Sequence, residues 1–254
     1  MTVLIATSTT DFDPSEVAIP WKVLRDAGVE VAFATDTGKV GSADPIMLSG
    51  KGLGFFKGSL IAGKAAQAAY KELLSDDNFQ NPIKYDAIKV ENYSGLVLPG
   101  GHAQGMLPYL ESKTLQTAIV GFFAADKPIG AICHGVVAVC RSINPDTGKS
   151  VLSGRKTTSL QNRQELLAHK LTKRKMGDYF LTYPDITVED EVVASLASAD
   201  DFVSGPNPMF RDSAKNLKPG FTVRDGNYLS ARWPGDAYSF SNEFLQMIRE
   251  YEDK

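Results

Sequence analysis

The segment 130–135 (GAICHG) contains the residues of this 254-residue chain that are best suited to chemistry. An apolar run of strand type ends at Ile132, and a helical pattern begins directly after it, with small residues two positions before and two after the cysteine. This pattern is typical of a nucleophile elbow, a sharp turn that lifts a reactive side chain clear of a sheet. Amide groups at the start of the helix are expected to lower the pKa of the thiol. We therefore predict that Cys133 is a nucleophile that works with His134.

A glycine pair after another predicted strand is expected to face Cys133, because ligands bind at the carboxyl ends of parallel strands. Gly100 and Gly101 follow the strand 95–98. One of their amides, together with the amide of His134, would form an oxyanion hole. The next residue, His102, either lines the pocket or caps the helix that follows.

Glu16 lies in the first turn of a predicted helix that follows the strand 3–7. One interpretation is a glutamate that stabilises the helix dipole from a solvated face. The other places its carboxyl beside the Cys133 sulfur, where a neighbouring thiolate would raise the pKa of Glu16 and make it a proton donor or shuttle.

The elements that would position these residues alternate between strand and helix patterns. Short apolar or β-branched runs predict strands at 3–7, 30–35, 95–98, 129–132 and 156–159, and a hairpin formed by 221–223 and 228–231. Helical spacing predicts helices at 15–26, 61–74, 115–125, 134–141, 163–171 and 237–251. Such alternation favours an α/β fold, a parallel sheet covered by helices. We expect one domain over residues 1–254, with an insertion at about 38–92 that packs over one end of the sheet.

Charge and apolar patterning exclude several classes of partner. The 27 basic and 30 acidic residues give a formal net charge of −3, so nucleic acid is not an expected partner. The most apolar stretch, 118–140, is interrupted by the sequence DKP and is not expected to enter a membrane. The first residues lack the basic region of a secretory signal, so we expect a cytoplasmic protein.

The two cysteines lie seven residues apart, about 10 Å along a helix, which is too far for a disulfide. Cys140 fits a packed helix face. No paired ligand spacing such as C-x-x-C is present, and the glycine pair is not followed by the spacing of a phosphate-binding loop. We therefore expect no metal and no cofactor.

Three segments together resemble the ThiJ/PfpI superfamily, a branch of the class I glutamine-amidotransferase-like fold: 16–20 (EVAIP), 96–102 (LVLPGGH) and 131–135 (AICHG). The resemblance covers about residues 1–160 well and the remainder more weakly. It implies a flavodoxin-like, doubly wound, mostly parallel sheet with helices on both faces and a small inserted cap region. It also implies a homodimer. The insertion before Tyr93 is similar to that of the chaperone and glyoxalase III branch.

Members of that branch convert methylglyoxal and glyoxal to D-lactate and glycolate without glutathione, and some are stress chaperones. The resemblance therefore implies a cofactor-free lyase for a small aldehyde, with Glu165 as the acidic residue that orients His134. The sequence departs from the family pattern near 158–160 and 231–236. Asp236, or an aspartate near Asp200, is the alternative acidic partner.

In the leading hypothesis, the Cys133 thiolate attacks the aldehyde carbon to give a hemithioacetal. Glu16 or His134 then moves a proton between adjacent carbons through an enediol. The second hypothesis is a cysteine-dependent amidase or peptidase. The third, from a different class, is a non-enzymatic redox sensor or holdase chaperone with an oxidisable Cys133.

Overall fold

A seven-stranded sheet forms the centre of the molecule, and the computed structural model describes residues 1–253. The strands are β1 (Thr2–Thr7), β2 (Glu30–Thr35), β3 (Ile83–Lys84), β4 (Gly95–Leu98), β5 (Ile129–Ile132), β6 (Thr222–Asp225) and β7 (Tyr228–Ala231). Their order is β3-β2-β1-β4-β5-β7-β6, and every neighbouring pair is parallel except the β6–β7 hairpin. This topology confirms the predicted α/β fold and its mostly parallel sheet.

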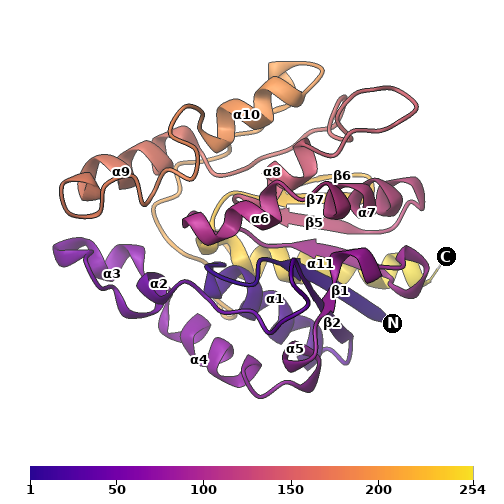
Figure 1. Cartoon of the computed structure of the whole chain (residues 1–254), viewed down its shortest axis with the longest axis horizontal. Coiled ribbons are helices and arrows are strands. Elements are labelled where there is room, and N and C mark those ends of the chain that lie inside the picture. Colours follow the sequence, from indigo (N-terminus) through magenta and orange to yellow (C-terminus); the bar gives the residue numbers. More distant parts are fainter. Residues whose placement is uncertain (254) are drawn as a thin grey trace.

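The central strands β1, β4 and β5 are buried along almost their whole length, which is why they read as continuous apolar runs in the sequence. Helices cover both faces of the sheet (Figure 1). On one side lie α1 (Pro14–Asp26) and α11 (Ala237–Glu252), and on the other lie α6 (Leu107–Leu110), α7 (Lys113–Ala124) and α8 (Gly135–Cys140). The chain is therefore doubly wound.

The remaining helices either extend these two layers or lie at one end of the molecule. They are α2 (Pro45–Ser49), α3 (Lys57–Leu60), α4 (Lys64–Leu73), α5 (Asp77–Gln80), α9 (Asn162–Met176) and α10 (Val188–Ser195). Figure 1 shows α2 and α3 opposite α9 at the same end of the molecule. Met47, Leu53 and Phe180 form a small hydrophobic cluster of their own between these elements. The cap at this end therefore draws on α9 and the loop after it as well as on the segment 38–92.

The predicted strand at 156–159 is wrong. Within it, only Thr157 makes a single parallel bridge, to Phe202. Bonds to side-chain hydroxyls of β7 replace a strand ladder: the Thr158 amide donates to Ser230 Oγ at 3.0 Å, and Thr157 Oγ1 lies 3.1 Å from the Tyr228 hydroxyl. The described residues contain no helix that is both long and apolar enough to cross a membrane.

Candidate active site

The candidate site lies at the carboxyl end of the sheet, where the winding direction reverses. Strands β1 and β4 are neighbours, yet β2 and β5 lie on their opposite sides, so the loops that follow them run apart and leave a crevice. Glu16 enters this crevice from α1 after β1, Gly101 and His102 from the loop after β4, and Cys133 from the turn after β5. The sequence placed these residues together, and the structure does so.

Cys133 occupies the sharp turn between β5 and α8 in a left-handed conformation, with φ of 58°. A side chain rarely adopts this conformation unless its surroundings enforce it. The Cys133 amide donates to the Ala231 carbonyl at 3.1 Å, and a Cβ on Gly135 would lie 2.0 Å from the Leu98 carbonyl oxygen. Only glycine therefore fits two residues after the cysteine, as the elbow pattern predicts.

His134 presents one ring nitrogen to the thiol and the other to Thr182. Cys133 Sγ lies 3.4 Å from His134 Nδ1, and Thr182 Oγ1 lies 2.9 Å from His134 Nε2. The same Thr182 hydroxyl donates to the His102 carbonyl oxygen at 2.7 Å. A hydroxyl has one proton, so Thr182 must accept from His134 and the ring carries its hydrogen on Nε2. Nδ1 is then the bare acceptor that faces the Cys133 thiol.

Glu165, in the first turn of α9, lies behind His134. Its Oε1 is 4.0 Å from His134 Nε2, and its Oε2 accepts from the Val188 amide at 2.9 Å. Burial raises the pKa of Glu165 to about 7 and lowers the pKa of His134 to about 3. Glu165 is therefore near enough to stabilise a protonated His134, whereas the nearest hydrogen-bond partner of the ring is Thr182. Sequence reasoning missed Thr182, because it lies in a loop that lacks a recognisable motif.

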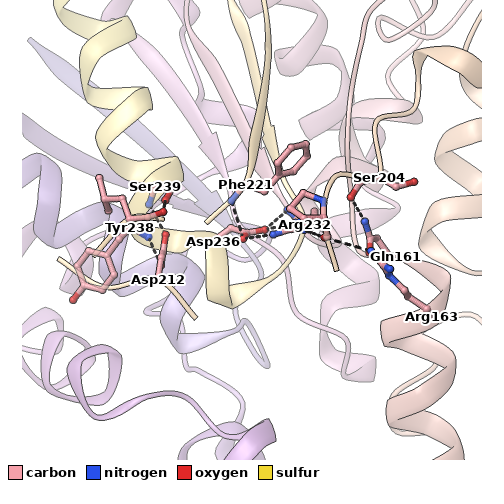
Figure 2. A network of polar contacts seen from close by, with 11 residues as sticks. Gln161, Arg163, Ser204, Asp212, Phe221, Arg232, Asp236, Tyr238 and Ser239 are labelled. Atoms are coloured by element: carbon pink, nitrogen blue, oxygen red, sulfur yellow. Dashed lines mark hydrogen bonds and ion pairs between the residues drawn. The ribbon is translucent and has the colours of Figure 1, made fainter. Parts of the chain in front are cut away.

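The alternative acidic partners are placed elsewhere. Asp236 forms a buried, two-pronged ion pair with Arg232, with both N–O distances at 2.8 Å, and also accepts from the Phe221 amide (Figure 2). Asp200 is exposed. The structure therefore leaves Glu165 as the acidic neighbour of His134.

Glu16 is fully buried, and its position follows from the start of α1. The Asp13 carboxylate caps this helix by accepting from the amides of Ser15 and Glu16 at 2.7 and 3.2 Å. Glu16 Oε2 accepts from the Gly100 amide at 2.7 Å, and the carboxyl adjoins the Cys133 thiol. Burial and the nearby Asp13 raise the pKa of Glu16 well above its ordinary value. The solvated-face interpretation is therefore wrong.

This arrangement corrects one expected role. The Gly100 amide binds Glu16 and is not available as an oxyanion donor. The His134 amide does face the sulfur, and Gly101 lines the same pocket, so these two amides are the candidate donors. A Cβ on Gly100 would lie 2.6 Å from the His134 amide nitrogen, so glycine is required there for close approach.

The ionisation of Cys133 also differs from expectation. Burial and the carboxyls of Glu16 and Asp13 raise the pKa of the thiol, while the His134 amide opposes this effect. Burial outweighs the amide dipoles, so the expected low pKa is wrong. A thiolate can form only if Glu16 keeps its proton and the thiol proton passes to a base.

His102 lines the pocket beside these groups. Its ring stacks on Phe180 with centroids 4.5 Å apart and meets Tyr179 edge-on at 4.7 Å. Burial lowers the pKa of His102 to about 4, so this side chain is neutral at physiological pH. Cys140, in contrast, is packed in α8, and burial raises its pKa to about 12.

The reactive groups form the floor of a pocket of about 370 Å³. Its walls are mostly apolar and come from α2, α3, α9 and the segment 204–212, which precedes β6. Among residues 1–253, no cluster of three or more His, Cys, Asp or Glu side chains could hold a metal ion.

Comparisons with known proteins agree with this fold. A family model described as ThiJ/PfpI family-like matches residues 7–206. A glutathione-independent glyoxalase of Schizosaccharomyces pombe is 27% identical over 92% of this chain and 85% of its own length. The deglycase PfpI of Pyrococcus furiosus is 25% identical over 95% of this chain and 96% of its own. A solved glyoxalase III of Candida albicans has the same fold, with a TM-score of 0.70 at 18% identity over 97% of both chains.

Proposed function

This chain belongs to the ThiJ/PfpI family, and from that premise we propose that it is a glutathione-independent glyoxalase that converts 2-oxoaldehydes to 2-hydroxy acids. The observation that carries the proposal is the constellation at the elbow: Cys133 in a left-handed turn, a bare His134 Nδ1 at 3.4 Å and a buried Glu16. Relatives named as glyoxalases and deglycases support an enzyme of one of these two types.

The first step would join sulfur to the aldehyde carbon. The Cys133 thiol attacks that carbon, its proton moves to His134 Nδ1, and the carbonyl electron pair moves onto oxygen. The amides of Gly101 and His134 would hold this oxygen until it takes up the proton. Glu165 would stabilise the transient imidazolium from 4.0 Å.

The second step would shift hydrogen between carbons. His134 Nδ1, bare again after the first step, removes the hydrogen of the aldehyde carbon and passes it to the neighbouring carbonyl oxygen, which gives an enediol. Glu16 then protonates the neighbouring carbon and its carboxylate takes back the hydroxyl proton of the former aldehyde carbon, leaving a thioester on Cys133. Water then cleaves the thioester and restores the thiol. The aldehyde carbon is oxidised, the neighbouring carbon is reduced, and one water is added. The balance needs no external oxidant, reductant or cofactor.

The test uses methylglyoxal without glutathione, with both aldehyde loss and D-lactate measured. We expect stoichiometric D-lactate from the wild type and none from Cys133→Ala. Cys140→Ala is the matched control, since Cys140 is also buried but lies away from the pocket lining. Aldehyde loss without lactate, or a fully active Cys133→Ala, would contradict the proposal.

A deglycase activity is the second candidate, favoured by the names of the archaeal relatives. It would use the same thiol on the hemiaminal that methylglyoxal forms with an amine. A pre-formed methylglyoxal adduct of N-acetyl-arginine, incubated with an excess of an aldehyde scavenger, distinguishes the two activities. Direct cleavage proceeds with the scavenger present, whereas glyoxalase action on released aldehyde stops.

A further inference from the structure

The pocket above Cys133 is larger and more apolar than a three-carbon aldehyde requires. Its volume of about 370 Å³ lies in the range of sites that enclose drug-sized ligands. Methylglyoxal would occupy only the floor, where the thiol, Glu16 and His102 lie. Above that floor the lining is dominated by leucine, methionine, phenylalanine, tryptophan and proline side chains.

One wall belongs to α9, which turns leucines toward the opening. Leu167 and Leu171 are four residues apart and so lie on one face of the helix, and both line the pocket. Leu167 is 55% exposed and Leu171 is 42% exposed. Single exposed leucines are ordinary, but these two continue directly into the apolar wall above the nucleophile. A ligand group that covered them would remove apolar surface from water.

Another wall is the segment 204–212, which contributes Pro208, Met209 and Arg211 to the lining. Met209 is 72% exposed. Hydrogen bonds between side chains and backbone groups hold this segment at both ends (Figure 2). At one end, Arg232 donates to the Pro206 carbonyl at 2.5 Å and Gln161 donates to the Ser204 carbonyl.

At the other end, Asp212 accepts from the amides of Tyr238 and Ser239 at 3.2 and 2.6 Å (Figure 2). The Arg232 side chain that holds the first end is itself fixed by the buried pair with Asp236. The fold therefore holds the segment 204–212 in place before a ligand arrives. An apolar slot between this segment and Leu167 and Leu171 of α9 would bind its ligand with little loss of conformational entropy in that wall.

We infer that the natural substrates are 2-oxoaldehydes with a large apolar substituent, an aryl group or an alkyl chain of about six carbons, which lies between α9 and the segment 204–212. The inference rests on the proposed function: Cys133 attacks the aldehyde carbon at the floor, and the chain extends along Leu167 toward Met209. Each methylene buried in the slot raises kcat/KM by up to about fourfold.

The first experiment compares methylglyoxal, n-hexylglyoxal and phenylglyoxal with the full chain, without glutathione. We expect kcat/KM for n-hexylglyoxal to exceed that for methylglyoxal at least tenfold. Leu167→Asn should lower the ratio of kcat/KM for n-hexylglyoxal to that for methylglyoxal about fourfold or more. Leu166→Asn is the matched control, because Leu166 is 47% exposed on the same helix but does not line the pocket. Equal values for the three substrates, or equal effects of the two variants, would overturn the inference.

A second readout separates failure of this inference from failure of the proposed function. Methyl and hexyl methanethiosulfonate both form a disulfide with Cys133 and release a sulfinate, and mass spectrometry gives the rates. We expect the hexyl reagent to react at least tenfold faster than the methyl reagent relative to their rates with free cysteine. Leu167→Asn should abolish that preference. If no aldehyde is converted but this preference is present, the slot is established and the glyoxalase chemistry is refuted. If aldehydes are converted without any preference, the slot inference is refuted alone.

Discussion

Thr182 determines which nitrogen of His134 faces the thiol, and replacing it tests the reasoning about the site most directly. Thr182→Val keeps the shape of the side chain but removes the hydroxyl that lies 2.9 Å from His134 Nε2 and 2.7 Å from the His102 carbonyl oxygen. The buried Nε2–H then loses its acceptor, so the ring no longer favours the form with a bare Nδ1. Thr182→Ser keeps the hydroxyl and is the control.

The magnitude follows from the burial of both partners. His134 is fully buried, and a buried group that loses its hydrogen-bond partner costs about 1–3 kcal/mol. If the reactive form of the site, in which His134 Nδ1 is bare, becomes less stable by this amount, kcat/KM drops by about 5- to 150-fold. We expect the loss in kcat rather than in KM, because Thr182 does not line the pocket.

The assay is turnover of methylglyoxal and n-hexylglyoxal without glutathione, combined with nitrogen-15 NMR of the His134 ring. Wild type and Thr182→Ser should show the hydrogen on Nε2, and Thr182→Val should show a mixture of ring forms. A folded Thr182→Val with kcat within twofold of wild type would refute the argument, and so would an unchanged ring spectrum.

Three further variants test other parts of the structure. Burial raises the pKa of Glu165 to about 7, so its carboxylate predominates only above that pH. Wild-type kcat/KM should therefore rise as the pH passes 7, and Glu165→Gln should abolish this rise in the pH–rate profile. Gly135→Ala places a Cβ 2.0 Å from a backbone oxygen of β4 and should lower the free energy of unfolding by about 1–3 kcal/mol or more in urea titrations. Arg232→Met leaves the buried Asp236 carboxylate without its ion-pair partner and should lower the free energy of unfolding by about 3–5 kcal/mol in the same titrations. Adding Asp236→Leu should restore most of this stability.

The sheet and the floor of the site could be predicted from the sequence because their signals are local. Strands β1, β4 and β5 are buried on both faces and read as apolar runs that end in a glycine pair, a cysteine or a polar turn. Carboxyl ends of adjacent parallel strands must meet, so Gly101 and Cys133 could be placed together without knowing any distance.

Other features depend on contacts that the sequence pattern does not contain. Thr182 lies 48 positions after His134, in a loop, and only the fold brings its hydroxyl to the ring. The segment 156–159 has β-branched residues, but its hydroxyl bonds to β7 replace a strand ladder. The ionisation of Cys133 was misjudged for a related reason: helix amides can be read from the sequence, whereas complete burial beside Glu16 cannot.

Burial also bears on which electrophile the site can attack. Burial keeps His134 neutral at neutral pH and raises the pKa of both Glu16 and the Cys133 thiol, which disfavours an imidazolium–thiolate pair before substrate binds. An amide is a weak electrophile and needs a strong nucleophile such as a preformed thiolate, which the raised pKa of the Cys133 thiol disfavours. An aldehyde is attacked far more readily and has no leaving group, and its oxygen takes up the thiol proton from His134 within the site. The same burial that weakens the thiolate therefore favours aldehyde chemistry over peptide hydrolysis.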